Sequence, residues 1–141
     1  MIATKSIRVV LVDDSALVRE RLAAFLSALD GVEVAGQAAD IPSGTALVRQ
    51  TRPEVLLLDL DFRGEDGTEL LATARKENPS LVIIMLTNHD YPKLRQQCAQ
   101  LGADFYFHKA TEFEKMLKVC QDLAYSGISP KPNPTTDRRQ K

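Results

Sequence analysis

The sequence has little cysteine and no long hydrophobic run. Of its 141 residues two are cysteines, Cys98 and Cys120, which are too few for a disulfide framework and do not form a CxxC metal site. Their apolar neighbours place both in buried helical positions. The longest apolar run, residues 81–86, is far shorter than the ~18 residues that suggest a membrane span. No signal-peptide core fits the N-terminus. We therefore expect a cytoplasmic protein that does not enter a membrane.

The chain also lacks a surplus of charge of one sign. Lys and Arg number 18 against 19 Asp and Glu, a net charge of −1, which argues against a nucleic-acid binder. The balance hides an asymmetry, because residues 126–141 carry four basic side chains against Asp137 alone. The same segment holds three of the 7 prolines and one large apolar residue, Ile128. Such a composition cannot bury enough surface to order itself. We expect one folded domain over residues 1–125 and a flexible basic tail or linker over 126–141.

Short apolar runs alternate with helical patterns along the chain. The runs cover residues 7–12, 32–35, 55–58, 81–86 and 105–107, and most are apolar throughout, as in strands covered on both faces. Between the first two, Val18, Leu22, Phe25, Leu26 and Leu29 recur on one helical face. Further helical patterns cover 42–51, 66–76, a segment from Pro92 to Leu101 that Asp90 can cap, and Phe113 to Leu123. The alternation predicts an α/β fold with a doubly wound, five-stranded parallel sheet.

Polar residues lie at, or just after, the carboxyl ends of four of the five predicted strands. They are Asp13 and Asp14 after the first strand, Asp59 and then Asp61 after the third, Thr87 at the end of the fourth, and Lys109 after the fifth. The carboxyl ends of parallel strands lie at one edge of the sheet, and open α/β sheets bind ligands at that edge. If the first and third strands are neighbours, the carboxylates of Asp13, Asp14 and Asp59 lie about 5 Å apart. At a separation of ~4 Å their mutual repulsion is on the order of 4 kcal/mol per pair at an effective dielectric of ~20. Proton uptake could relieve this repulsion, but a divalent cation relieves it better. Hard oxygen ligands suit Mg²⁺.

The same residues could carry out phosphoryl transfer. Asp59 is the best-placed nucleophile, and its attack on a phosphoryl group would give an aspartyl phosphate. Lys109 and the Thr87 hydroxyl could hold the phosphoryl oxygens. Taken singly, each residue is more typical of a structural role: an Asp that caps a helix, a Thr in a turn, a solvated Lys. Together, at the one edge where this fold builds sites, they favour a functional cluster.

Several segments resemble the receiver domain of bacterial two-component response regulators, the chemotaxis type included. The matching segments are residues 11–15 around the acid pair, 57–60 around Asp59, Asp66-Gly67 with Glu69-Leu70, Leu86-Thr87, and Gly102-Ala103-Asp104 ahead of Tyr106 and Lys109. The resemblance covers residues 6–125 and its five-point spacing is specific. It implies a flavodoxin-like (βα)5 fold with strand order 2-1-3-4-5.

The resemblance also implies residue roles. Asp59 would be the phosphorylation site, taking its phosphoryl group from a histidine kinase or phosphotransfer protein, with Thr87 and Lys109 as the other catalytic residues. Mg²⁺ would be held by Asp13, Asp14, Asp59 and the backbone carbonyl of Asp61. Thr87 and Tyr106 would form the switch, and Asp61 and His89 would tune the lifetime of the phosphate. The chain would catalyse only its own phosphorylation and dephosphorylation, and so is not an enzyme in the usual sense.

The signal would leave through protein contacts. In such domains the switch reshapes the face made by the fourth helix, the fifth strand and the fifth helix, by which a local charge change biases a two-state element. An unidentified downstream protein, or a second copy of the chain in a homodimer, would bind there. Candidate surface residues are Phe105, Tyr106, Phe113, Lys93, Arg95, Gln96 and Gln97.

Two departures from the family pattern and several alternatives stand beside this interpretation. Phe62-Arg63 replaces a common Met-Pro, and Ala110 replaces a common proline whose cis bond would cost ~2.5–4 kcal/mol at alanine.

The chain could be the receiver part of a DNA-binding response regulator whose effector domain is absent. Asp59 and Asp61 also resemble the DxD motif of haloacid-dehalogenase phosphatases, although the acid pair there comes last. A flavodoxin-like cofactor binder would need a phosphate loop in place of Asp13 and Asp14. A pseudo-receiver would act by protein contact alone.

Overall fold

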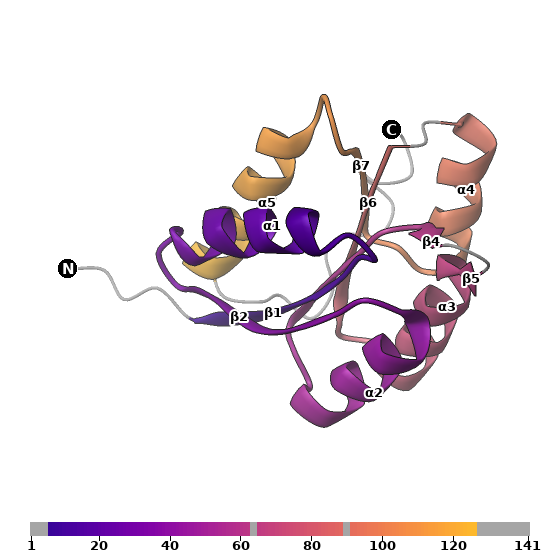
Figure 1. Ribbon diagram of the computed structural model, residues 1–141, viewed down its shortest axis with the longest axis horizontal. Helices are drawn as coiled ribbons and strands as arrows, with labels where there is room; N and C mark the ends of the chain where they lie inside the picture. The colour runs from indigo at the N-terminus through magenta and orange to yellow at the C-terminus, as the bar shows by residue number, and fades with distance from the viewer. Residues whose placement is uncertain (1–5, 63–64, 89–90, 127–141) are drawn as a thin grey trace.

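The computed structural model describes residues 6–62, 65–88 and 91–126. Its strands are β1 (Ile7–Val12), β2 (Val32–Ala38), β3 (Val55–Leu58), β4 (Asp61–Phe62), β5 (Glu65–Asp66), β6 (Val82–Thr87) and β7 (Phe105–His108). Its helices are α1 (Ala16–Ser27), α2 (Ile41–Thr51), α3 (Gly67–Glu77), α4 (Pro92–Leu101) and α5 (Phe113–Ser126). Figure 1 shows their arrangement around the sheet. Of the predicted tail, residues 126–141, Ser126 is the last residue of α5, and residues 127–141 lie outside the described part of the chain.

The main sheet has five parallel strands in the order β2-β1-β3-β6-β7. This is the order 2-1-3-4-5 that the resemblance implies, and it confirms the predicted fold class. The five predicted runs all became strands, β2 extending to Ala38 and β6 to Thr87. The prediction missed β4 and β5, which pair antiparallel between β3 and α3 with Asp61 opposite Asp66. Two residues per strand are too short for the alternation on which a strand prediction rests.

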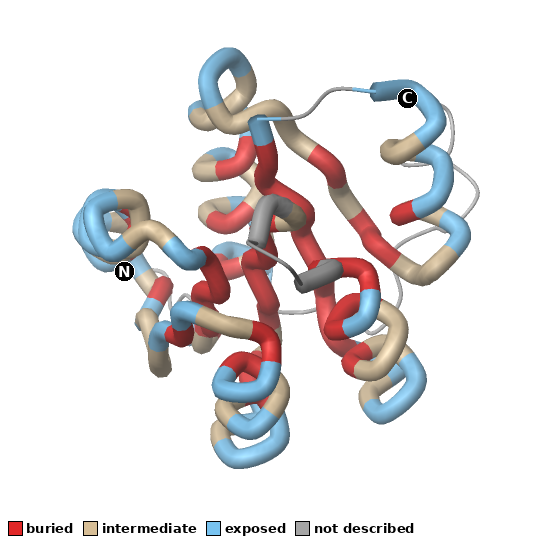
Figure 2. The backbone as a smooth tube through the Cα atoms, turned by 45° about the vertical axis from the view of Figure 1, so that its right-hand side comes forward, coloured by how far each residue is buried: buried red, intermediate tan, exposed pale blue. Residues whose placement is uncertain are grey.

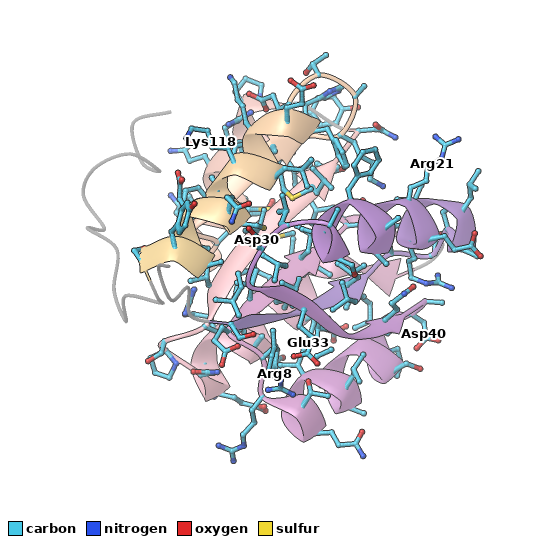
Figure 3. All side chains as sticks on the ribbon, turned by 90° about the vertical axis from the view of Figure 1, so that its left-hand side faces the viewer. Arg8, Arg21, Asp30, Glu33, Asp40 and Lys118 are labelled. Atoms are coloured by element: carbon cyan, nitrogen blue, oxygen red, sulfur yellow. The ribbon has the colours of Figure 1, made fainter. Side chains whose placement is uncertain are left out.

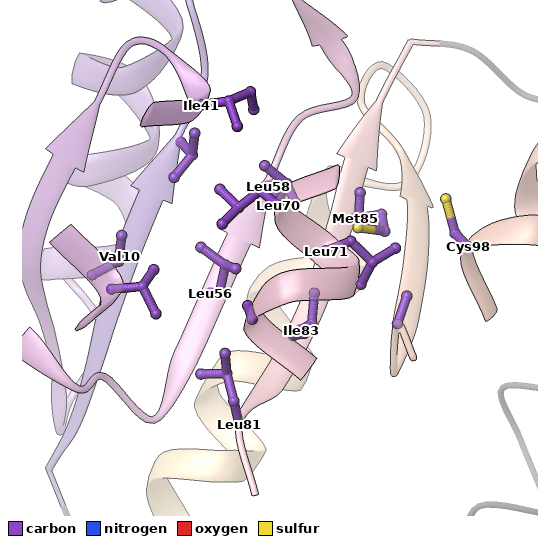
Figure 4. Packing of buried hydrophobic residues seen from close by; sticks show 14 of the residues in the cluster. Val10, Ile41, Leu56, Leu58, Leu70, Leu71, Leu81, Ile83, Met85 and Cys98 are labelled. Atoms are coloured by element: carbon purple, nitrogen blue, oxygen red, sulfur yellow. The ribbon is translucent and has the colours of Figure 1, made fainter. Parts of the chain in front are cut away.

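Helices cover both faces of the sheet, so that there are two apolar layers. One face packs against α1 and α5, whose buried residues include Leu22, Leu26 and Met116. The other packs against α2, α3 and α4 through residues such as Leu71 and Cys98 (Figure 4). Buried residues follow the strands while exposed ones lie on the outer turns of the helices (Figure 2). The central strands are therefore apolar on both sides, which explains their continuous hydrophobic runs.

The helix ends differ in detail from the prediction. Ser15 caps α1 through its side chain, which accepts a hydrogen bond from the amide of Val18. Tyr91 is the N-cap of α4 and makes no side-chain cap bond, and the predicted cap, Asp90, lies outside the described residues. Gly102 ends α4 with a φ of 114°, a conformation that glycine adopts without strain. The helices thus begin and end close to the predicted positions.

One residue of α1 that was predicted to lie in the core is exposed. Phe25 is 50% exposed instead of buried, and its ring meets Phe113 edge-on with the ring centroids 5.2 Å apart. The helical face that packs on the sheet is narrower than the pattern suggested, with Leu22 and Leu26 as its buried members. Figure 3 shows Arg21 on α1 and Lys118 on α5, both of them exposed. An apolar residue at the border of such a face can remain in solvent.

Both cysteines are buried in helices, as predicted. Cys98 lies in α4 and Cys120 in α5. Burial raises the pKa of the Cys120 thiol to about 12, so that the reactive thiolate is scarce at neutral pH. This agrees with a packing role. Among the described residues no helix combines the length and the apolar character that crossing a bilayer requires.

An ion pair between α3 and the turn before β7 is expected to support the fold strongly. The Asp104 carboxylate accepts hydrogen bonds from the Arg75 guanidinium at 2.7 Å and the Ile83 amide at 2.9 Å, and Asp104 is 5% exposed. Replacing Asp104 by Ala removes the shared partner of the buried Ile83 amide and of the Arg75 guanidinium, whose side chain is 22% exposed and also donates to the Gly102 carbonyl. Because the amide loses its partner while Arg75 keeps its carbonyl acceptors, we expect the free energy of unfolding in urea to fall by about 1–3 kcal/mol.

The matched control is the ion pair between Arg49 of α2 and Glu77 of α3, whose side chains are 57% and 43% exposed. Water and salt screen such a pair, so Arg49→Gln should leave the unfolding midpoint almost unchanged. Equal losses in the two variants would show that burial does not distinguish these pairs.

Candidate functional site

The carboxyl ends of β1 and β3 bring three carboxylates together. The strands pair in parallel with Val12 opposite Leu58, so Asp13 and Asp59 follow them side by side. Backbone hydrogen bonds fix both positions, since the Asp59 amide donates to the Val12 carbonyl at 2.9 Å and the Asp13 amide to the Ala38 carbonyl at 3.1 Å. One oxygen from each of Asp13, Asp14 and Asp59 lies within 4.8 Å of the others. The predicted clustering of these residues is confirmed.

Lys109 reaches this cluster from the end of β7. Its Nζ lies 2.8 Å from a carboxylate oxygen of Asp13 and 3.3 Å from one of Asp59. Its amide donates to the carbonyl of Thr87 at 2.7 Å, which ties the end of β7 to the end of β6. Thr87 is fully buried. The structure thus brings the predicted Asp13, Asp14, Asp59, Thr87 and Lys109 to one edge of the sheet.

Opposing effects act on the pKa of Lys109. Burial by itself lowers the pKa of the ammonium group. The hydrogen bond to Asp13 and the charge of Asp59 outweigh this, and the pKa of Lys109 is raised above its usual value of 10.5. Lys109 is therefore a firm cation at neutral pH. It can hold an incoming anionic group as well as the carboxylates.

The turn between β1 and α1 positions the acid pair. A carboxylate oxygen of Asp13 accepts from the amide of Ser15 at 2.9 Å. The guanidinium of Arg19, one turn into α1, donates to the Asp13 carbonyl at 2.7 Å. Arg19 was not among the predicted site residues. Its position in the first turn of the helix that follows the acid pair could have indicated it. Side chains of a helix tilt toward the helix N-terminus, so a side chain from this turn can reach the preceding turn of the backbone.

The donor set suits magnesium. Asp13 and Asp59 are 3% and 4% exposed, whereas Asp14 is exposed, so the cluster has a buried floor and an open side. Carboxylate oxygens are hard ligands, and Mg²⁺ in proteins is usually held by one or two carboxylates together with water. Asp13, Asp14 and Asp59 therefore fit the ion, with Lys109 as the counter-charge beside them. Asp14 is the member that an ion from solvent would meet first.

The other predicted site residues fall in different places. Tyr106, expected in both the switch and the partner surface, is buried at 7% exposure and packs in the α2, α3 and α4 layer. As a surface residue it was therefore wrongly placed. Asp61 lies in β4, directly beyond the acid cluster in the chain. His89 lies outside the described residues, so its tuning role stays a prediction. The described residues contain no cis peptide bond.

Comparison with known proteins places this arrangement in a family. Residues 9–121 match the family model of the response regulator receiver domain. The chain is 32% identical over 114 residues to the uncharacterized transcriptional regulatory protein YhcZ of Bacillus subtilis, covering 81% of this chain and 53% of that protein. It is 31% identical over 121 residues to the transcriptional regulatory protein MctR of Rhizobium johnstonii, covering 86% and 56%. The chain thus spans about half the length of these curated relatives.

Solved structures agree with the sequence relatives. The signal receiver domain of NarL from Mycobacterium tuberculosis superposes with a TM-score of 0.78 at 31% identity, covering 87% of this chain and 98% of that one. The chemotaxis protein CheY4 of Vibrio cholerae superposes with a TM-score of 0.74 at 28% identity, covering 83% and 98%. With the acid cluster, the buried threonine and the lysine at the expected strand ends, this chain belongs to the response regulator receiver domains of two-component signalling.

Proposed function

We propose that the chain is a phosphoacceptor switch in which Asp59 takes a phosphoryl group with the help of Mg²⁺. The observation that carries the proposal is the contact of Lys109 with both Asp13 and Asp59 inside a cluster of three carboxylates. A lysine and a divalent ion together offset the negative charge that a phosphoryl group would bring to Asp59. The family membership makes this the expected use of the cluster.

The donor would be a phosphohistidine on a histidine kinase or phosphotransfer protein. A carboxylate oxygen of Asp59 attacks the phosphorus, an O–P bond forms, and the P–N bond breaks with its electron pair on the imidazole nitrogen. Asp13, Asp14 and Asp59 would hold the Mg²⁺, which supplies positive charge next to the transferred group. Lys109 would bind one phosphoryl oxygen and the Thr87 hydroxyl another. Every residue named here lies at the edge of the sheet where β1, β3, β6 and β7 end.

Hydrolysis of the aspartyl phosphate would reset the switch. We propose that the chain catalyses both steps on itself and acts on no separate substrate, with Asp61 and His89 setting the lifetime. The exposed part of α4 and the neighbouring β7 and α5 would contact a downstream protein or a second copy of the chain. The cytoplasmic location expected from the sequence stays a prediction.

The proposal predicts a covalent adduct. Incubating the wild-type chain with acetyl phosphate and Mg²⁺ should add the mass of one phosphoryl group to the intact protein. Chelating the metal should suppress the gain, and hydroxylamine should remove it because acyl phosphates react with this nucleophile. Intact mass spectrometry measures all three. Failure of both acetyl phosphate and a phosphohistidine protein to yield any adduct would contradict the proposal and favour a pseudo-receiver.

A second candidate places the same switch in a longer protein. The named relatives are transcriptional regulatory proteins, and this chain covers 53% of one and 56% of the other. The chain would then be the receiver part of a DNA-binding response regulator, joined to its effector domain through residues 126–141. In both candidates Asp59 has the same role. The receiver part by itself is expected not to bind DNA.

A further inference from the structure

A charged side chain of α4 contacts the switch tyrosine directly. By sequence alone, Arg95 belongs with Lys93, Gln96 and Gln97 to a polar outer surface of this helix. The latter three are exposed, but Arg95 is turned toward β7 and its side chain is only 27% exposed. Its guanidinium carbon lies 4.7 Å from the centre of the Tyr106 ring, and its Nη1 donates to the Tyr106 carbonyl at 3.3 Å. Arg95 therefore covers the ring and is also joined to its backbone.

The same guanidinium connects α4 to the loop between β7 and α5. Its Nη2 lies 3.8 Å from a carboxylate oxygen of Glu112. That same carboxylate oxygen accepts from the amide of His108 at 2.8 Å, and the Glu112 amide donates back to the His108 carbonyl at 2.9 Å. Glu112 thus closes the turn that contains Lys109. A continuous series of contacts runs from Arg95 through Glu112 to the residue that precedes Lys109.

The other end of this series is the phosphoacceptor cluster. Lys109 is held between the carbonyl of Thr87, through its amide, and the carboxylates of Asp13 and Asp59, through its ammonium group. Tyr106 lies opposite Met85 on β6, two residues before Thr87, so the ring and the cluster share the same pair of strands. A movement of the Lys109 turn would therefore act on Arg95 and the Tyr106 ring together.

We propose that Arg95 is a positioning residue that holds the Tyr106 ring in its buried place and, through Glu112, steadies the turn that carries Lys109. This inference rests on the proposed phosphoacceptor role of Asp59 for its functional part only. A guanidinium over an aromatic ring is attracted by the negative face of the ring. One planar group contacts the Tyr106 ring, the Tyr106 carbonyl and the Glu112 carboxylate. A displacement of α4 therefore displaces the turn between β7 and α5, and the reverse holds as well. Lysine lacks the planar fork needed for all three contacts.

Fluorine NMR can observe the Tyr106 ring without any phosphoryl donor. The chain has 3 tyrosines, and 3-fluorotyrosine labelling would give one resonance for each, with that of Tyr106 assigned through Tyr106→Phe. Tyr91 and Tyr125 are both 58% exposed and serve as internal references for solvent contact. In the wild type the Tyr106 resonance should shift little between H2O and D2O. In Arg95→Met, which keeps the apolar stem, it should shift toward the values of Tyr91 and Tyr125.

Three further variants separate the contacts. Glu112→Gln retains an acceptor for the His108 amide but removes the charge opposite Arg95, and should also raise the solvent shift of Tyr106. Arg95→Lys should restore part of the wild-type behaviour. Gln100→Ala, at an exposed position of the same helix, should leave the resonance unchanged. Circular dichroism on each variant checks that the fold persists.

Phosphorylation by acetyl phosphate and Mg²⁺ gives the functional measurement. Loosening the Lys109 turn lowers the fraction of molecules with the lysine in place, so Arg95→Met and Glu112→Gln should react about two- to fivefold more slowly than the wild type and Gln100→Ala. An unchanged Tyr106 resonance in Arg95→Met would overturn the inference, as would an equal change in Gln100→Ala. If no variant, the wild type included, accepted a phosphoryl group, the proposed function would fail while the fluorine measurement still decided the role of Arg95.

Discussion

Replacing Asp59 by Asn is expected to abolish the phosphoryl adduct that the wild-type chain forms with acetyl phosphate and Mg²⁺. The carboxamide has almost the same shape as the carboxylate but is a far weaker nucleophile, so no acyl phosphate should form. The fold should persist, because the Lys109 ammonium keeps its shorter contact, 2.8 Å to Asp13. Intact mass spectrometry under conditions that fully modify the wild type measures the effect.

Asp122→Asn is the matched control for this experiment. Asp122 lies on α5 with its side chain 63% exposed, far along the chain from the cluster, and its loss should leave the adduct intact. An adduct that survived in Asp59→Asn would show that another side chain is the nucleophile. Peptide mapping of the hydroxylamine product would then identify it.

Replacing Lys109 by Met is expected to slow phosphorylation by about 10²–10³-fold. Charge develops on the phosphoryl oxygens during transfer, and the loss of one fixed donor at such a position typically costs this much in rate. Met has a similar length and keeps the packing of the stem. Lys118→Met provides the control, because Lys118 is 77% exposed on α5 and pairs only at 3.7 Å with Asp122. A rate for Lys109→Met within a few-fold of the wild type would show that Lys109 does not act on the transferred group.

The pH dependence of stability gives a separate check on Lys109. Its pKa is raised in the folded chain, since the hydrogen bond to Asp13 and the charge of Asp59 outweigh burial, so the folded state holds the proton more tightly than the unfolded state. The stabilisation is fully present below the unfolded pKa, about 10.5, and is lost as the pH rises through the raised pKa of the folded form. The wild type should therefore lose more stability above this pH than Lys109→Met does, in urea unfolding at each pH.

Local pattern was sufficient for the elements that are long and buried. The continuous apolar runs of β1, β3 and β6 and the spacing of Leu22 and Leu26 in α1 reflect burial on known faces, and the structure confirms them. The pattern did not reveal β4 and β5, whose two-residue strands are stabilised by each other and not by a hydrophobic period. Phe25 was misplaced for a related reason, because a helical face has borders whose burial depends on the neighbouring helix.

The composition of the candidate site followed from the sequence. Asp13, Asp14, Asp59, Thr87 and Lys109 each stand at a strand end, and a parallel sheet necessarily brings those ends to one edge. The closeness of Asp13 and Asp59 required one further fact, that β1 and β3 are neighbours, and the sheet order supplies it. The hydrogen bonds that hold Lys109 between Asp13 and Thr87 connect residues far apart in the chain and have no local signal.

By itself the sequence determined the fold class, the five residues of the cluster and the burial of both cysteines. Hydrophobic periodicity and the residue types at strand ends depend only on positions that are close together in the sequence, so they can be recognised without the fold. Only the tertiary structure decided that Tyr106 is buried and that Arg95, expected in solvent, lies over its ring and reaches Glu112. The reason is physical: a long, flexible cation has many rotamers, and the position of its partners on β7 and the following turn selects one of them. The few cysteines and the balanced charge excluded other classes of protein. The contacts of Arg95 with Tyr106 and Glu112 depend on the packing of α4 against β7, which the composition does not determine.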